Sequence, residues 1–220
     1  MHIVIFSNGS FDNPELDRQR IRPDAMTIAA DGGLEHCLAL DLTPDLLVGD
    51  LDSVEPQLVE RLRKAGTEIQ EHPRRKDYTD LELALESAVQ HTPEEILILG
   101  GLGGRWDQTL TNILLLSQLR FRGPRILLAD GLQQIELIFG GSNLNISANP
   151  GATVSLVPIK GPATGITTQG LEYELAEGTL EYGSSQGVSN VMVGQHASVT
   201  LKEGILACVL IDADYESLEI

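Results

Sequence analysis

The stretch LLVGDLDS, residues 46–53, decides the fold class, because an apolar run ends there in two carboxylates. Residues 46–48 read as a buried strand, and Asp50 and Asp52 follow where the backbone leaves that strand. Two carboxylates two residues apart can face the same way, so the pair can chelate a hard cation. The alternative is an ordinary turn, in which Asp and Ser side chains bond to their own backbone.

A second stretch, RRKDYTD at residues 74–80, places two further carboxylates and a lysine at the start of an expected helix. Asp77 and Asp80 are three residues apart, so they share one face of the first turn. The positive end of that helix attracts phosphate, and Lys76 stands beside it as a phosphate partner. Carboxylates for Mg²⁺, a lysine and a helix N-terminus are parts that nucleotide-dependent phosphoryl transfer requires. The alternative for Asp77 and Asp80 is a helix cap and its partner.

Short apolar runs alternate with helical patterns over the first part of the chain. The expected strands are residues 3–6, 27–30, 46–48, 67–70, 96–99 and 126–129, and the expected helices are at about 55–65, 79–90 and 106–120. Strand and helix alternation of this kind predicts an α/β fold, with a mostly parallel, Rossmann-like sheet flanked by helices.

Acidic residues and glycines follow the expected strands. The segments concerned are Ser7-Asn8-Gly9, Asp31-Gly32-Gly33, Gly49-Asp50-Leu51-Asp52, the glycine-rich residues 100–105, and Asp130-Gly131. Connections at the opposite edge, such as Thr92-Pro93, carry ordinary turn residues. Ligands of parallel α/β sheets bind beyond the carboxyl ends of the strands, so we expect a site at this edge, with Asp31 among its residues.

The glycine-rich segment GGLGGRWDQTLTN, residues 100–112, does not have the pattern of the common nucleotide-binding loops. The absence of Gly-Lys-Ser/Thr excludes a P-loop, and Trp106 stands where a dinucleotide fingerprint needs its last glycine. Arg105 suits a phosphate fork, and Asn112 lies further along the same expected helix. Asp107 suits a ribose, a metal or a helix cap. For Trp106, packing away from solvent is favoured over stacking on a base, and no role is assigned to it.

The hydrophobic pattern of the sequence changes after about residue 140. Short alternating runs replace the helical patterns, at residues 153–158, 171–176, 179–182, 197–201 and 206–211. Short strands separated by turn residues predict a smaller all-β sandwich domain. We therefore expect an α/β domain at residues 1–140 and a β-sandwich domain at residues 141–220; the resemblance described below implies that the first is the catalytic domain, which binds ATP and Mg²⁺.

The composition limits the partners and the location of the protein. A formal net charge of −17 over 220 residues argues against binding to nucleic acid or to an anionic membrane. After residue 141 the basic residues are only Lys160 and Lys202, so a polyphosphate is expected to bind in the first part. Cys37 and Cys208 sit in apolar contexts and read as buried thiols in a reducing compartment. Without a signal peptide pattern or a long apolar run, the expected location is the cytoplasm.

Five motifs in register resemble the thiamine pyrophosphokinases. They are DGG from residue 31, PDLLVGDLDS at 44–53, KDYTDLELAL at 76–85, GGLGGRWDQTLTN at 100–112 and GVSN at 187–190. The resemblance covers nearly the whole chain. It implies transfer of a diphosphate group from ATP to thiamine, leaving AMP. It also implies a homodimer, with each active site between the α/β domain of one subunit and the β-sandwich of the other.

The resemblance also implies roles for individual residues. Asp50, Asp52 and Asp80 would hold Mg²⁺ against the ATP phosphates, and Asp31 would orient the substrate or the metal. Lys76 and Arg105 would neutralise developing charge, with Asp77, Asp107 and Asn112 among the nucleotide-binding residues. Ser189 and Asn190 would hydrogen-bond the aminopyrimidine of thiamine; the alternative for these two is an ordinary Ser-Asn turn.

Other functions remain open from the sequence. One is a pyrophosphokinase that acts on another hydroxymethyl heterocycle, such as a pterin. Another is a module that binds a nucleotide or thiamine without catalysis, although the concentration of metal-type carboxylates speaks against it. A metal-dependent phosphatase would use similar acids and would release inorganic phosphate.

Overall fold

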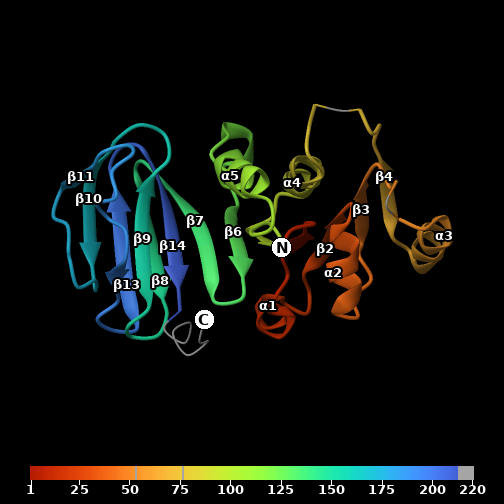
Figure 1. Ribbon diagram of the computed structural model, residues 1–220, viewed down its shortest axis with the longest axis horizontal. Coiled ribbons are helices and arrows are strands. Elements are labelled where there is room, and N and C mark those ends of the chain that lie inside the picture. Colours follow the sequence, from red (N-terminus) through yellow and green to blue (C-terminus); the bar gives the residue numbers. More distant parts are fainter. Residues whose placement is uncertain (53, 76, 213–220) are drawn as a thin grey trace. The chain divides into compact units, whose positions relative to one another are not determined.

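The computed structural model describes residues 1–52, 54–75 and 77–212 (Figure 1). The chain divides into two compact units, Met1–Gly131 and Leu132–Ile220. The domain boundary expected between residues 140 and 141 falls at the turn between the first two strands of the second unit. Among the described residues, none of the helices is long and apolar enough to cross a membrane.

The first unit is built on a parallel sheet. Its strands are β1 (His2–Phe6), β2 (Met26–Ala30), β3 (Leu46–Gly49), β4 (Glu68–Glu71), β5 (Glu95–Leu99) and β6 (Arg125–Asp130), in the order β6-β5-β1-β2-β3-β4. All of these neighbours pair in parallel. The carboxyl ends of the strands therefore meet at one edge, and the predicted parallel α/β fold is confirmed.

Helices connect the strands of this unit. They are α1 (Pro14–Arg20), α2 (Gly33–Ala39), α3 (Pro56–Ala65), α4 (Asp80–Gln90) and α5 (Trp106–Leu115), followed by the 3-10 helix η1 (Leu119–Phe121). The three helices expected from the sequence are present, although the last ends at Leu115 rather than near residue 120. The sequence does not predict α1 or α2, because helices of seven residues are too short to show a helical period.

The inner strands β1, β2, β3 and β5 are buried along most of their length, whereas the edge strand β4 is not. In β1 every residue after His2 is buried, as expected for a strand covered on both faces. Val4 and Phe6 pack with Cys37 and Leu40 from α2 and its C-cap, in a cluster that also includes residues of β5 and β6. Burial raises the pKa of the Cys37 thiol to about 12, so this cysteine is an inert core residue, as the sequence predicts.

The second unit is antiparallel. Its strands are β7 (Gln133–Phe139), β8 (Ser142–Ser147), β9 (Thr153–Pro158), β10 (Ala163–Gln169), β11 (Gly178–Leu180), β12 (Asn190–Val191), β13 (His196–Leu201) and β14 (Ile205–Ile211). Within the unit they pair in the orders β12-β9-β14-β7 and β11-β10-β13-β8. One apolar core takes residues from both sets, including Leu156, Leu206 and Val199. This arrangement confirms the predicted all-β second part.

The prediction of one strand in this unit, at residues 171–176, is wrong. Residues 171–176 alternate between apolar and polar types, but only Leu171 makes a bridge, to Met192. Side chains accept hydrogen bonds from two N–H groups of this segment: Tyr173 N–H donates to Asn190 Oδ1 over 3.1 Å, and Leu175 N–H donates to Thr168 Oγ1 over 2.8 Å. Glu172 N–H donates to the backbone oxygen of Val191 over 2.9 Å, but no continuous ladder forms. Alternation alone cannot distinguish this pattern from a ladder.

Candidate functional site

Two glycines bring the loops after β1 and β5 into backbone contact. Gly9 N–H donates to Gly100 O over 2.7 Å, and Ser10 N–H donates to Leu102 O over 3.1 Å. Gly100 has φ +66°, and a Cβ there would lie 2.2 Å from Ser7 O. No other residue fits that position without moving the backbone, so the glycine fixes how closely the two loops approach.

The loop after β2 carries a strained aspartate. Asp31 has φ +46°, a left-handed conformation that is uncommon for residues other than glycine, and its N–H donates to Val48 O over 2.8 Å. A Cβ at Gly32 would lie 2.5 Å from the Asn8 amide, and one at Gly33 would lie 2.1 Å from Phe6 O. Strain of this kind persists where surrounding contacts enforce it, and it clusters at functional sites.

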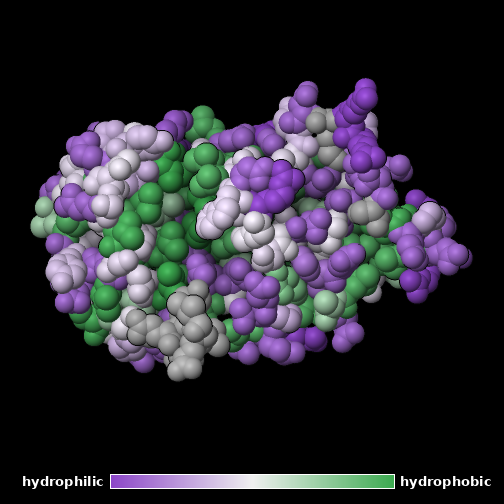
Figure 2. All heavy atoms as spheres, viewed as in Figure 1, coloured by the Kyte–Doolittle hydropathy of each residue, from purple (hydrophilic) through white to green (hydrophobic). Residues whose placement is uncertain are grey.

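These loops and the starts of α4 and α5 enclose a cavity of about 420 Å³ in the first unit. It is lined by Ser7, Asn8, Ala30, Asp31, Thr79, Asp80, Leu81, Arg105, Asp107, Gln108, Thr111 and Asn112. Hydrophilic side chains gather over the start of α5 in Figure 2. The structure thus brings together five of the residues singled out from the sequence: Asp31, Asp80, Arg105, Asp107 and Asn112.

The start of α4 is capped by a residue that was not singled out from the sequence. Thr79 is the N-cap, and its Oγ1 accepts a hydrogen bond from Glu82 N–H over 3.2 Å. Because Thr79 satisfies this orphan N–H, the interpretation of Asp77 as the cap is wrong. Asp80 is the first residue of the helix and lines the cavity, whereas Asp77 is exposed and lies outside the lining.

Arg105 and Asp107 form a two-pronged ion pair at the start of α5. Arg105 Nε donates to Asp107 Oδ1 over 3.1 Å, and Nη2 donates to Oδ2 over 2.5 Å. The hydrogen bond from Arg105 holds the pKa of Asp107 below its usual range, and the same bond raises the pKa of Arg105. Asp107 is the second residue of α5 and not its N-cap, so the cap interpretation does not hold. The carboxylate instead orients the guanidinium beside the cavity.

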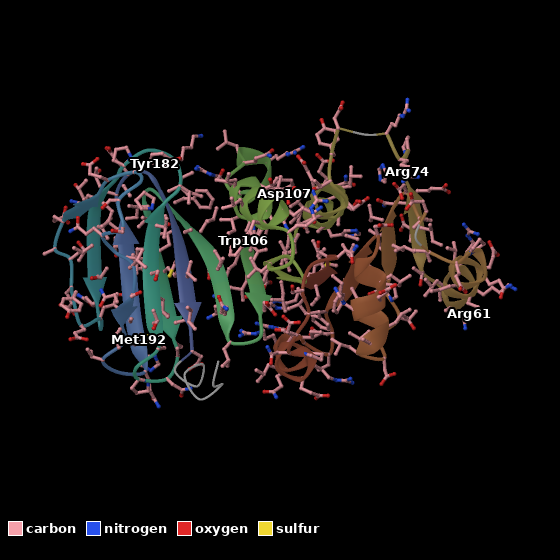
Figure 3. The ribbon with its side chains drawn as sticks, viewed as in Figure 1. Arg61, Arg74, Trp106, Asp107, Tyr182 and Met192 are labelled. Carbon is pink, nitrogen blue, oxygen red and sulfur yellow. The ribbon has the colours of Figure 1, made fainter. Side chains whose placement is uncertain are left out.

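Trp106 lies between these two residues and points into solvent. Its side chain is 79% exposed, and it projects from the start of α5 beside Asp107 (Figure 3). The expectation that Trp106 packs away from solvent is therefore wrong. Leu110 and Leu114 follow at intervals of four residues and are 58% and 49% exposed, so α5 presents an apolar stripe.

Asn112 holds the glycine-rich loop from inside the unit. This residue is buried, and its Nδ2 donates to Gly101 O over 2.8 Å. Thr109 Oγ1 donates to Gly103 O over 3.2 Å from the preceding turn. These bonds tie the loop to α5, so Asn112 shapes the cavity wall as well as lining it.

Asp50 and Asp52 lie on the loop after β3 and are outside the cavity lining. Asp50 Oδ1 accepts a hydrogen bond from Asp52 N–H over 3.2 Å, which is the turn-type bond considered from the sequence. Asp52 Oδ2 lies 3.2 Å from Arg74 Nη1, in an exposed ion pair. Gly49, the last residue of β3, adjoins a lining residue, because a Cβ at Gly49 would lie 3.2 Å from Asp31 Oδ1. Lys76 lies outside the described residues.

The donor set at this edge fits magnesium bound together with a nucleotide. Within the described parts of the chain, no group of three or more His, Cys, Asp or Glu side chains is placed to hold a metal by itself. Asp31 and Asp80, however, line one cavity and offer carboxylate oxygens. Magnesium at nucleotide sites commonly takes one or two carboxylates and completes its shell with phosphate oxygens and water.

The cavity also contains residues that were not selected from the sequence. Asn8 and Gln108 line it, from the loop after β1 and from α5. Asn8 follows a predicted strand at the same edge as the acids, which is the signal that could have identified it. Gln108 follows Asp107 on α5, and its type alone carried no indication.

The second unit has a cavity of its own, of about 320 Å³. Its lining is uncharged and consists of Leu156, Thr168, Tyr173, Leu175, Leu180, Gln186, Gly187, Val188, Ser189 and Asn190. Asn190 Nδ2 donates to Tyr173 O over 2.8 Å, while its Oδ1 accepts from Tyr173 N–H. Ser189 has φ +62°, and its N–H donates to Ser155 Oγ over 3.0 Å. The two residues expected at the ring-binding site therefore both line this cavity.

A parallel α/β unit whose cavity contains carboxylates and an arginine beside glycine-rich loops is typical of the class of proteins that bind phosphorylated nucleotides. The family model described as "Thiamin pyrophosphokinase, catalytic domain" matches residues 18–128. The model described as "Thiamin pyrophosphokinase, vitamin B1 binding domain" matches residues 142–206. The chain belongs to the thiamin pyrophosphokinase family.

Individual relatives agree with this assignment. The chain is 30% identical over 183 residues to thiamine pyrophosphokinase of Bacillus subtilis (strain 168), covering 83% of this chain and 85% of the relative. It is 29% identical over 208 residues to thiamine pyrophosphokinase 1 of Oryza sativa subsp. japonica, covering 84% and 76%. The crystal structure of thiamine pyrophosphokinase from Bacillus subtilis superposes with a TM-score of 0.83 at 27% identity, covering 96% of this chain and 99% of that one.

Proposed function

We propose that this protein transfers a diphosphate group from ATP to thiamine, giving thiamine diphosphate and AMP. One observation carries the proposal. The unit that the catalytic-domain model matches contains a cavity with charged walls, and the unit that the vitamin B1 model matches contains an uncharged one. A polyphosphate and a ring system need these two different surroundings.

The reaction is a displacement at phosphorus. The hydroxyethyl oxygen of thiamine attacks the β-phosphorus of ATP, and the bond from that phosphorus to the α-phosphate oxygen breaks. The terminal diphosphate stays on thiamine, AMP leaves with the bonding electrons, and the hydroxyl proton passes to solvent or to a carboxylate. Because little covalent chemistry is required of the protein, its contribution is positioning and neutralisation of charge.

We assign the binding of Mg²⁺ to four carboxylates. Asp31 and Asp80 line the cavity, while Asp50 and Asp52 lie outside the lining, on the loop that follows Gly49, and are included on the sequence motif. Magnesium bound with ATP would neutralise phosphate charge and orient the β-phosphate. The Asp52–Arg74 pair is exposed on both sides, so exchanging it for a cation costs little.

We assign the binding of the nucleotide and its phosphates to Arg105, Lys76 and their neighbours. The Arg105 guanidinium is held by Asp107 at the cavity wall, and its planar fork suits phosphate oxygens. Lys76 is proposed as a second phosphate partner from the sequence, since it precedes Asp77 at the start of the α4 region. Asn112 supports the loop that faces the nucleotide.

Thiamine is assigned to the cavity of the second unit. Uncharged walls suit the aminopyrimidine and thiazolium rings, and Ser189 offers a hydroxyl group there. The Asn190 amide is already paired with the Tyr173 backbone, so we assign it to shaping the cavity more than to direct contact. The net charge of −17 is favourable for a substrate with a fixed positive charge.

We further propose a homodimer in the cytoplasm. Trp106, Leu110 and Leu114 form an exposed apolar stripe on α5, and such stripes are usually covered by a partner. Both cysteines are free and buried, which suits a reducing compartment. Sedimentation velocity tests the dimer: a single species of monomer mass at micromolar concentration would contradict it.

Product analysis tests the reaction itself. Purified protein is incubated with Mg²⁺, ATP and thiamine, and the products are separated by chromatography. We expect AMP and thiamine diphosphate in equal amounts. ADP with thiamine monophosphate would indicate an ordinary kinase, and inorganic phosphate with unchanged thiamine would indicate a phosphatase; either result would overturn the proposal.

A further inference from the structure

His36 of α2 contacts a loop that forms one wall of the charged cavity. Its Nε2 lies 2.9 Å from Gly9 O, at the end of the segment Ser7-Asn8-Gly9. Its ring stacks on Phe11, with the ring centroids 4.8 Å apart and the planes inclined by 29°. A carbonyl oxygen can only accept, so Nε2 carries the proton of this hydrogen bond. His36 therefore holds the loop after β1 at two points.

The same side chain touches the loop after β5. A Cβ at Gly100 would lie 3.0 Å from His36 Cδ2, and Gly9 N–H donates to Gly100 O over 2.7 Å. His36 itself lies on the helix that begins directly after Asp31 and Gly32. One imidazole thus connects the loops that follow β1, β2 and β5.

The loop that His36 holds carries cavity residues. Ser7 and Asn8 line the cavity, and the Asn8 amide fills the space over Gly32, where a Cβ would lie only 2.5 Å away. A rotation of the Gly9 peptide would move Asn8 against the Asp31 loop. Because no space is left between them, a small displacement at Gly9 would be transmitted to Asp31.

We propose that His36 is a positioning residue for the diphosphate transfer: its Nε2–H holds Gly9 O and so fixes Ser7, Asn8 and Asp31 around the nucleotide. The inference rests on the proposed function. His36 is outside the cavity lining, so it acts through the loop and not by contact with the substrate. Both the neutral Nε2–H tautomer and the imidazolium supply the required donor.

Two substitutions separate the hydrogen bond from the ring contact. In His36→Phe the ring can still stack on Phe11, but the donor is lost. In His36→Gln the amide nitrogen can reach the position of Nε2, but the stacking is lost. We expect kcat/KM for ATP to fall by about 10- to 100-fold in His36→Phe, because misplaced groups reduce rates by such factors. His36→Gln should stay within about threefold of the wild type, since the donor is retained.

The control is His91→Phe, at the exposed C-cap of α4, which should leave the kinetics unchanged. Tm measurements accompany the kinetics, and each variant should remain within about 5 °C of the wild type. Wild-type kinetics in His36→Phe would overturn the proposal. Equal losses of activity and Tm in both His36 variants would also overturn it, because they would mean that only packing matters.

Hydrogen exchange tests the same inference without the reaction. The amides of residues 9 and 10 should exchange about tenfold faster in ligand-free His36→Phe than in the wild type, and at nearly the wild-type rate in His36→Gln. Unchanged exchange in His36→Phe would overturn the role of His36. Absence of thiamine diphosphate from the wild-type assay would instead overturn the proposed function, so the two failures are distinguishable.

Discussion

The cavities of the two units differ in almost every property that matters for binding. The cavity of the first unit, about 420 Å³, is lined by three carboxylates and an arginine, from the strained loop after β2 and from the starts of α4 and α5. The neutral cavity of the second unit described above, about 320 Å³, is lined by aliphatic, aromatic and neutral polar side chains from strands and from the connecting segments at residues 173–175 and 186–189. On the proposed function, the phosphate charge of the nucleotide is neutralised at the carboxyl ends of the parallel strands. The rings of thiamine bind where the cavity walls are uncharged.

Near both cavities, side chains form hydrogen bonds with backbone groups of the loops. Around the first cavity, side chains hold backbone carbonyls of the loops, as Asn112 does for Gly101 and His36 does for Gly9. Around the second cavity, Asn190 holds both the N–H and the C=O of Tyr173. In both units, polar side chains shape the cavity walls through hydrogen bonds to the backbone.

The largest effect is expected from Asp80→Asn in the first cavity. Removing the negative charge at the start of α4 should reduce kcat by about 10²- to 10³-fold, as loss of a transition-state electrostatic contact usually does. The KM for thiamine should change little, since the second cavity is untouched. Steady-state formation of AMP measures both. Asp24→Asn, on an exposed residue before β2, is the matched control. A tenfold rise in the KM for thiamine as well would contradict the assignment of the two cavities to different substrates.

A smaller and opposite pattern is expected from Asn190→Ala in the second cavity. The substitution removes both hydrogen bonds to Tyr173, so the segment that forms one wall loses its anchor. We expect the KM for thiamine to rise about tenfold, with kcat and the KM for ATP within about twofold of the wild type. Asn143→Ala, which loses one exposed hydrogen bond to Thr200, is the control. A rise in the KM for ATP instead would contradict the assignment.

The smallest effect is expected on stability, from Asp130. This carboxylate lies at the same edge of the parallel sheet but lines neither cavity. Burial, together with the nearby Asp17 and Asp12, raises the pKa of Asp130 to about 6. Asp17 is itself fully buried, and its Oδ1 accepts a hydrogen bond from Gly131 N–H over 3.0 Å. Asp130 is thus an ionised group in an unfavourable place at neutral pH, where it adds no catalytic charge to the cavity.

The pH dependence of stability follows from this shift. A native pKa above the unfolded value means that the native state binds a proton more readily, so the contribution is full below about pH 4 and is lost as the pH rises through about 6. Asp130→Asn should therefore raise the free energy of unfolding by about 1 kcal/mol at pH 7.5, a value reduced for partial exposure, and by nearly nothing at pH 4. Urea unfolding at both pH values measures it. Both KM values should stay unchanged; lower stability at pH 7.5 would show that Asp130 is favourably paired.

The first unit is the part that the sequence predicts well. Acids and glycines recur after strands, and parallel strands bring them to one edge, so this pattern predicts that Asp31 and Arg105 lie near one another, while Asp80 was selected from the helix-start motif at residues 74–80. Details that depend on local competition were not predictable: Thr79 caps α4 although Asp77 is also suited to it. The exposure of Trp106 could not be deduced either, because large apolar side chains are normally buried.

The second unit is harder to predict for a physical reason. Its cavity is formed by neutral residues whose types also occur in any antiparallel core, and its walls depend on bonds between residues far apart in sequence. The segment at residues 171–176 shows this, since its alternation suggests a strand while the N–H groups of Tyr173 and Leu175 donate to the Asn190 and Thr168 side chains. The motif at 187–190 stands out by resemblance, but its place in the cavity lining depends on tertiary contacts that no local pattern encodes.

Isothermal titration of Asp80→Asn tests most directly whether the two cavities serve different substrates. The variant is titrated with thiamine and, separately, with the Mg²⁺ complex of α,β-methylene ATP, in which the reacting bridge cannot be cleaved. We predict that the Kd for thiamine stays within about twofold of the wild-type value, while the Kd for the nucleotide complex rises by at least about tenfold. An unchanged nucleotide affinity, or a loss of thiamine affinity of the same size, would contradict the account.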